Sequence, residues 1–233
     1  NPVERAVRLY HLAGVNGKSP EGYFNLGHIL WTGCPENSDD AIIPPDIEKS
    51  LWAFDKAIEL GDADAMYFVG VHRMSLHGED RRKGLALIQL AADYHHGGAL
   101  YYLALLHRNG DTELDMSPSL ETFREFLEKA TDCHDPDALF LRAHCIFHGE
   151  DGYAQDYRLA LDGFLESASA GNPDGANSAG AMLHTGGYGG EIKKDQIKAF
   201  ELYQEAAEMG SIEGWRNVVA CYALGQGVPK CER

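Results

Sequence analysis

The side chains of this chain that could do chemistry are its histidines and cysteines. The sequence holds 11 histidines and 5 cysteines. His144 and His148 are four residues apart, a spacing that lets two side chains on one helix face bind zinc. No glutamate stands between them in a HExxH pattern, and no CxxC pair occurs in the sequence. We therefore predict no metal site and no bound cofactor, and interpret these histidines as packed or solvated side chains.

The cysteines do not form a disulfide framework or a catalytic set. They are odd in number and scattered, which argues against a disulfide-rich secreted scaffold. Cys145 and Cys221 stand among apolar residues, so we predict buried, reduced thiols. No arrangement of nucleophile, base and orienting group is recognisable. We predict that the chain has no catalytic residues and is not an enzyme.

Two loop-like stretches resemble ligand sites only superficially. Gly186–Gly190 (GGYGG) is rich in glycine like a phosphate-binding loop, but no strand precedes it and the GK[ST] ending is missing. Asp39–Asp40 and Asp111–Asp115 group carboxylates without the glycine spacing of a calcium loop. We predict a connector in the first case and solvated acidic turns in the others.

The charge balance favours protein partners. Lys and Arg number 20 against 36 Asp and Glu, a formal charge of −16. Such a field repels a phosphate backbone, so we predict no nucleic-acid binding and expect partners with basic segments. No apolar run approaches the roughly 18 residues of a membrane span, and the first residues do not resemble a signal peptide. A cytoplasmic location is favoured, while an upstream targeting segment would allow the endoplasmic-reticulum lumen or the mitochondrion.

The elements that must position all these residues form a tandem repeat of two helices. The residues that close the first helix of each unit are 44, 34, 38, 38 and 39 positions apart. These first markers are Gly17, Gly61, His95, Cys133, Gly171 and Gly210. The glycines that close the second helices keep a matching rhythm: Gly33, Gly78, Gly110, Gly149, Gly186 and Gly225. The six units span approximately residues 3–33, 46–78, 80–110, 118–149, 156–186 and 195–227.

Small residues recur at two columns of the second helices. The later column is Gly27, Gly70, Ala104, Ala143, Gly180 and Val219. Glycine inside a helix is unfavourable unless two backbones must approach closely, so the columns predict tight helix stacking. Val219 is the one bulky exception, and we expect an exposed apolar flank beyond Ala220. As helix N-caps we predict Asp46, Asp156, Asp195 and Ser117.

These motifs resemble the Sel-one-like repeat family, relatives of the tetratricopeptide repeat. The matching segments are AFELYQEAAEMG followed by GQGVPK, ALIQLAADYH followed by ALYYLALLHRNG, and SPEGYFNLGHILWTG. The resemblance covers almost the whole chain. It implies an all-α, right-handed α-solenoid, or superhelix, of helix-turn-helix repeats, in which the first helices line a concave face and the array serves as an adaptor or scaffold.

One column of the first helices suggests a binding surface. Nine residues before each first marker stand mostly polar residues: Arg8, Trp52, Ala86, Arg124, Asp162 and Glu201. Trp and Arg commonly anchor protein interfaces. We combine this column with the one three residues later in each first helix. The predicted partner-binding residues are then Arg8, His11, Trp52, Asp55 and Arg124. We expect apolar surface to continue at Leu127 and Leu165. The alternative is that Trp52 folds back onto the Cys34–Pro45 insertion.

The function favoured by these observations is a non-catalytic scaffold that assembles a multiprotein complex. Two alternatives stay open: a regulatory or substrate-targeting region of a larger enzyme, associated with a kinase or a ubiquitin ligase, and a structural subunit of an organellar complex. The carboxyl-terminal region of elongation-factor-2 kinase is similar in kind, including a TGGYG-type connector. Because the sequence begins and ends at repeat positions, we expect it to be an excerpt of a longer repeat protein.

Overall fold

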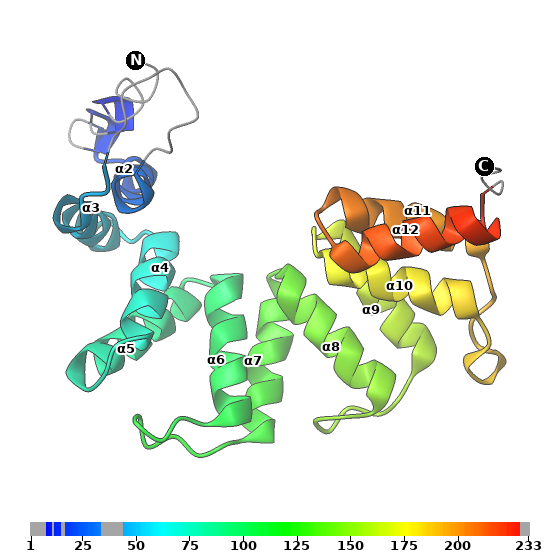
Figure 1. Ribbon diagram of the computed structural model, residues 1–233. Helices are drawn as coiled ribbons and strands as arrows, with labels where there is room; N and C mark the ends of the chain where they lie inside the picture. Colours follow the sequence, from blue (N-terminus) through cyan, green and yellow to red (C-terminus); the bar gives the residue numbers. More distant parts are fainter. Residues whose placement is uncertain (1–7, 11, 15–16, 34–43, 229–233) are drawn as a thin grey trace. The chain divides into compact units, whose positions relative to one another are not determined.

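The computed structural model describes residues 8–10, 12–14, 17–33 and 44–228. These residues are mostly helical, and no β-strand occurs among them (Figure 1). Two isolated β-bridges, Asp111 with Met116 and Gly187 with Ile192, close connector loops. The predicted all-α, helical-repeat solenoid is confirmed. Within the described part of the chain, no helix combines the length and the apolar character that crossing a membrane requires.

The helices follow one another with short connections and form two compact halves, residues 1–99 and 100–233. The first half contains α2 (Pro20–Thr32), α3 (Ile47–Glu59), α4 (Ala63–Met74) and α5 (Glu79–Asp93). Helix α6 (Gly97–Asn109) begins in the first half and continues in the second. The second half also contains α7 (Leu120–Asp132), α8 (Pro136–His148), α9 (Tyr157–Ser169), α10 (Pro173–Thr185), the 3₁₀ turn η1 (Tyr188–Gly190), α11 (Gln196–Glu208) and α12 (Ile212–Leu224). The prediction of one continuous array stays a prediction.

One short turn joins the first and second helix of each unit, and α3–α4 shows how it works. Gly61 adopts φ +87° and donates its N–H to the Ile58 carbonyl. The N–H of Asp62 reaches back to the Ala57 carbonyl, which completes a Schellman motif. The Asp62 carboxylate then accepts the Ala65 N–H at 2.7 Å and caps α4. A single residue therefore ends one helix and starts the next.

The same turn corrects the sequence register in two units. The left-handed residue before the cap is His134 (φ +57°) in the fourth unit, whereas Cys133 is still α-helical in φ at −82°. In the first unit it is Lys18 (φ +49°), followed by the cap Ser19. The predicted markers Cys133 and Gly17 were therefore each one residue too early. Polar caps follow the turn residue directly, so the turn can be recognised without a glycine.

The connectors between repeats differ in length, but four of them end alike. The N–H of the cap returns to a carbonyl in the last turn of the preceding helix: Asp46 to Leu30, Ser119 to His107, Asp156 to Ile146 and Asp195 to Leu183. Asp46, Asp156 and Asp195 cap their helices as predicted. The cap of α7 is Ser119, so the prediction of Ser117 was wrong. Gly78 was also misplaced, because α4 ends at Met74 and Gly78 is the N-cap of α5.

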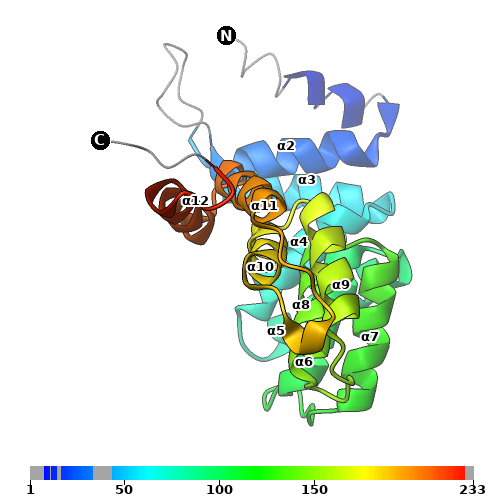
Figure 2. The same cartoon turned by 90° about the vertical axis from the view of Figure 1, so that its right-hand side faces the viewer.

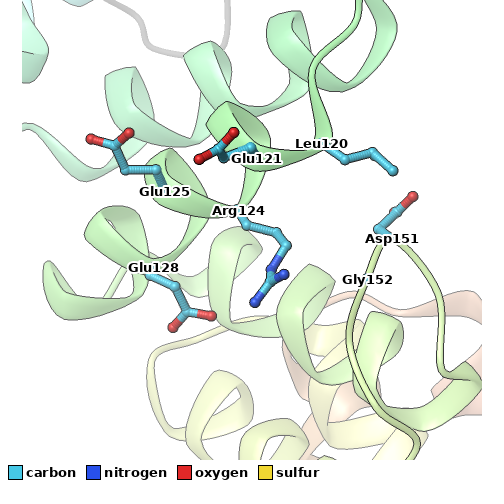
Figure 3. A pocket seen from close by; sticks show the side chains of 7 residues that line it. All are labelled: Leu120, Glu121, Arg124, Glu125, Glu128, Asp151 and Gly152. Carbon is cyan, nitrogen blue, oxygen red and sulfur yellow. The ribbon is translucent and has the colours of Figure 1, made fainter.

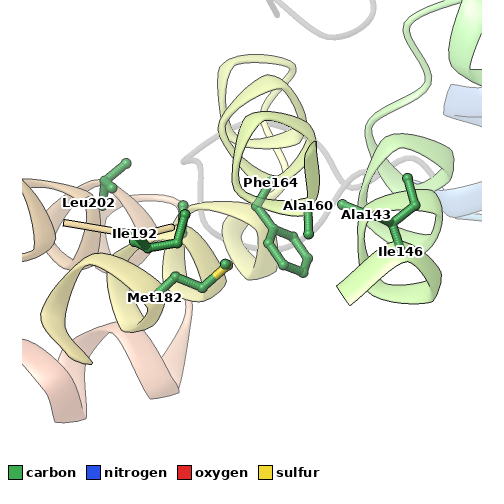
Figure 4. Close-up of a cluster of buried hydrophobic side chains, with 8 residues drawn as sticks. Ala143, Ile146, Ala160, Phe164, Met182, Ile192 and Leu202 are labelled. Atoms are coloured by element: carbon green, nitrogen blue, oxygen red, sulfur yellow. The ribbon is translucent and has the colours of Figure 1, made fainter. Parts of the chain in front are cut away.

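Small residues allow the helices to stack, as predicted. A Cβ at Gly27 would lie 2.7 Å from the ring of Phe54, and one at Gly180 would lie 2.9 Å from the ring of Tyr203. Larger side chains fill the space between these contacts. Figure 4 shows Phe164 of α9 between the α8 residues Ala143 and Ile146 and a second group on its other side: Met182, Ile192 and Leu202.

Candidate functional site

Trp52 is exposed on α3, the first helix of the second repeat, in the first half of the chain. Its side chain, on α3, is 44% exposed. Its ring meets the Tyr23 ring of α2 edge-on, with centroids 5.8 Å apart and an interplanar angle of 82°. Asp55, three residues later on the same helix, is also exposed. Most of the Cys34–Pro45 insertion lies outside the described residues, so the alternative packing of Trp52 stays untested. The contact with Tyr23 orients the indole while half its surface remains free.

The corrected register places two exposed leucines at positions equivalent to Trp52 and Asp55. With Lys18 as the turn residue, Leu9 and Leu12 become the equivalents of Trp52 and Asp55. They are 56% and 42% exposed. The Ser-Pro sequence at the start of α2 was the signal that could have revealed them. Of the two residues predicted in their place, Arg8 is exposed, and His11 lies outside the described residues.

Arg124 belongs to the second half of the chain, where it lines an open pocket of about 590 Å³. Figure 3 shows its guanidinium reaching from α7 toward the loop that carries Asp151 and Gly152. The other lining residues from α7 are Leu120, Glu121, Glu125 and Glu128. Arg124 and the three glutamates are spaced as one face of the helix. The pocket is therefore built mainly on a first helix, α7.

A polar network holds the walls of this pocket. Glu128 accepts hydrogen bonds from the Arg142 Nε at 3.1 Å and the Tyr153 hydroxyl at 2.8 Å. Burial, followed by the Glu128 hydrogen bond, raises the pKa of Tyr153 above its ordinary range. The Arg124 guanidinium lies over the Tyr153 ring, 5.1 Å from its centroid. These contacts fix Arg124 and Glu128 in place, because each is tied to the same tyrosine.

Most of the carboxylates that line the pocket are paired with cations of the same chain. Asp151 is neutralised by Arg108, whose Nη2 lies 2.6 Å from its Oδ2. Lys129 pairs with Glu125 at 2.7 Å, and this hydrogen bond lowers the pKa of Glu125. Glu121 stands exposed in the first turn of α7. Glu128 pairs with Arg142, whose Nε lies 3.0 Å from its Oε2. The pocket therefore presents the exposed carboxylate of Glu121 and the Arg124 guanidinium beside three paired carboxylates.

The exposed apolar surface predicted at Leu127 and Leu165, in the second half of the chain, is not formed as expected. Leu127 is fully buried, so that prediction was wrong. Its burial follows from the one-residue shift of the register. Leu165 is partly buried and packs against the apolar cluster around Phe164. Acidic side chains, rather than leucines, therefore dominate the exposed face of α7.

The groups considered for chemistry lie in different surroundings: His144 is partly buried and His148 is exposed. The His144 and His148 rings lie 4.5 Å apart, but no group of three or more possible metal ligands occurs among the described residues. Burial, then the neighbouring His148, lowers the pKa of His144. Cys145 is fully buried, and burial together with Asp151 raises its pKa to about 12. Gly186–Gly190 lies in the connector between α10 and α11.

Tandem helical hairpins that stack through small residues define a protein of the tetratricopeptide-like, helical-repeat class. Five stretches match the model of the Sel1 repeat: residues 20–62, 63–93, 98–135, 136–172 and 173–211. The chain belongs to the Sel1 repeat family, as its motifs predicted. Each match runs from the second helix of one unit through the first helix of the next. Sel1 repeats are commonly protein-interaction modules.

Solved structures support the fold. The chain is similar to a Sel1 repeat protein from Oxalobacter formigenes (TM-score 0.70, 24% identity), covering 91% of this chain and 57% of that one. It is also similar to the protective antigen c5321 of uropathogenic Escherichia coli (TM-score 0.68, 20% identity; 97% and 45% covered). A third similar structure is the immunity protein Pa5087 of Pseudomonas aeruginosa (TM-score 0.61, 19% identity; 89% and 75% covered). The chain spans about half the length of the first two. No curated protein matches the chain.

Proposed function

We propose that the chain is a non-catalytic scaffold that assembles other proteins through the exposed faces of its first helices. The observation that carries the proposal is Trp52. A large aromatic side chain that is 44% exposed on a helix face, oriented by Tyr23, has the character of an interface anchor. Leu9 and Leu12 are exposed apolar side chains at the equivalent positions of the preceding repeat.

The acidic residues that line the pocket in the second half of the chain support a partner with basic segments. The pocket on α7 presents Glu121, Glu125 and Glu128, and the whole chain carries a formal charge of −16. A lysine or arginine side chain entering the pocket could pair with Glu121, whereas Glu125 and Glu128 are already paired with Lys129 and Arg142. The Arg124 guanidinium restricts where that cation fits and could itself pair with an acidic group of the partner. In this proposal both halves of the chain bind through first-helix residues, the first half by apolar area and the second by charge.

The test is quantitative affinity capture with the wild-type chain and the Trp52→Ala/Arg124→Glu variant. We expect specific partners of the wild type to be depleted at least about tenfold by the two substitutions, since buried aromatic and arginine anchors dominate interface energies. The matched control is Leu76→Ala/Arg82→Glu, which changes an exposed leucine and an exposed arginine outside both surfaces. Unchanged recovery with the first variant, folded by circular dichroism, would refute the proposed surface.

A further inference from the structure

Two charged side chains of the pocket on α7 have no ionic partner within the described part of the chain. The other charges of the lining are paired: Asp151 with Arg108, Glu125 with Lys129, and Glu128 with Arg142. Glu121 and Arg124 remain, and both are exposed. They stand three residues apart on α7 without a hydrogen bond or salt bridge between them. The pocket therefore offers a ligand one carboxylate and one guanidinium.

The Arg124 guanidinium is held in place before any ligand arrives. It lies 5.1 Å from the centroid of the Tyr153 ring, and the Tyr153 hydroxyl donates to Glu128 at 2.8 Å. A Cβ at Gly152 would lie 3.3 Å from the Arg124 Nη1, so the glycine leaves room for the side chain. A guanidinium over a ring keeps its N–H groups in its own plane, where a carboxylate can accept two of them.

The loop that carries Tyr153 is fixed as well. The Glu150 N–H bonds to the Cys145 carbonyl at 2.9 Å, and the Tyr153 N–H bonds to the Glu150 carbonyl at 2.9 Å. Asp151 of the same loop is bound by Arg108, and its side chain is only 16% exposed. Helix α7 itself packs against α8 (Figures 1 and 2). A ligand that enters the pocket therefore meets preformed walls, which lowers the cost of ordering them.

The two unpaired charges select the chemistry of the ligand. A purely basic segment would satisfy Glu121 but meet the like charge of Arg124, and a purely acidic segment would do the reverse. The Cβ atoms of residues three apart on a helix are about 5–6 Å apart. In an extended chain, side chains two residues apart point to the same side and are separated by about 6–7 Å. An acidic and a basic residue at that spacing match the pair on α7.

We propose that the pocket on α7 binds an extended segment of a partner protein that carries an acidic and a basic side chain two residues apart. The acidic side chain pairs with Arg124, and the basic one pairs with Glu121. Tyr153 is a positioning residue, because it acts through Arg124. The inference rests on the proposed function, since it names the partner chemistry of one of its surfaces.

Capped pentapeptides, titrated into the full ¹⁵N-labelled chain and followed by NMR chemical shifts, test the proposal. The parent peptide is Ala-Lys-Ala-Glu-Ala. We expect replacement of either its glutamate or its lysine by glutamine to weaken binding about fivefold. Arg124→Gln should abolish the preference for glutamate and keep the one for lysine, whereas Glu121→Gln should do the opposite. The control Arg158→Gln, which removes an exposed arginine of α9 outside this pocket, should change neither preference.

Variants of Tyr153 separate positioning from a merely structural role. Tyr153→Phe keeps the ring under Arg124 and should keep the preference for glutamate. Tyr153→Leu removes the ring and should lose that preference, while the preference for lysine and the circular dichroism spectrum stay unchanged. Parallel loss of both preferences in Tyr153→Leu would show that the residue only supports the fold.

Two results would overturn the proposal. Equal affinity for a peptide with glutamine at both charged positions would show that the pocket does not read charge. Tighter binding of a peptide with lysine at both positions would make it a site for basic segments alone. If Trp52→Ala depletes captured partners although the peptides show no preference, the scaffold proposal stands and this inference fails. Selective peptide binding without any captured partner would support the pocket and refute the scaffold.

Discussion

Gly70 of α4 and Ile88 of α5 pack so closely that no side chain fits between them. A Cβ at Gly70 would lie 2.7 Å from Cγ1 of Ile88 and 3.1 Å from the Gly84 carbonyl oxygen. The neighbours are partly backbone, so they cannot move aside without shifting the helix. The contact makes glycine a requirement of stacking at this position.

We therefore expect Gly70→Ala to destabilise the chain by about 1–3 kcal/mol, because overpacking outweighs the gain in helix propensity. Urea denaturation followed by circular dichroism measures the change. Gly98→Ala is the matched control, since its closest neighbours are ring atoms of His96 and Tyr67 at 3.2 and 3.3 Å, which can shift. Equal effects of the two substitutions would contradict the close contact.

The turn between α7 and α8 makes a prediction about which residue should be glycine. His134 has φ +57°, whereas Cys133 has φ −82°. Relief of the left-handed strain should make His134→Gly more stable by about 1 kcal/mol. Cys133→Gly should instead lose up to about 1 kcal/mol, since glycine gains nothing in a helical conformation. If thermal unfolding ranked the two variants in the opposite order, the original register with Cys133 at the turn would be right.

The cap of α4 should give a measurable pH dependence. Burial raises the pKa of Asp62 above 3.8, despite the hydrogen bond from the Ala65 N–H. The folded state then binds this proton more tightly than the unfolded state, so the stability contributed by Asp62 falls as pH rises from 3.8 through the folded pKa.

Asp62→Asn keeps an N-cap acceptor and removes that cost, so at about pH 7 it should be at least as stable as the wild type. Asp62→Ala should lose about 1 kcal/mol because the cap itself disappears. Urea titrations at about pH 4 and about pH 7 compare the three chains. A wild-type chain whose Asp62 contribution grew with pH would show that the carboxylate is stabilised, not penalised, by its site.

Thiol reactivity should follow burial. Cys133 is exposed, whereas Cys145 and Cys221 are buried. With a pKa of about 12, Cys145 carries almost no thiolate at about pH 8. Iodoacetamide should label Cys133 at least about tenfold faster than Cys145, as followed by peptide mass spectrometry. Denatured protein supplies the control rates, and comparable labelling in the native chain would refute the burial of Cys145.

Much of the fold could be predicted from the sequence because the repeat is encoded in local chemistry. Three of the four predicted caps are correct, since an aspartate before an apolar helix has few other roles. The register failed where the turn residue was Lys18 or His134. A left-handed conformation can be held by the surrounding hydrogen bonds without glycine, so residue type alone did not identify it.

The candidate surfaces were harder to predict, because they depend on which side chains share a face. Trp52 stood out by residue type and is exposed. Leu9 and Leu12 were missed through the one-residue register error. The acidic pocket at Arg124 was also missed, since Asp151 reaches it from the connector between α8 and α9. Contacts between a helix and a distant loop leave no periodic signal.

The central claim is that first-helix faces recruit protein partners, and the most direct measurement is affinity capture with mass spectrometry of the wild type beside its variants. The account predicts partners that Trp52→Ala/Arg124→Glu depletes at least about tenfold and Leu76→Ala/Arg82→Glu retains. Equal recovery of every partner by both folded variants would contradict it.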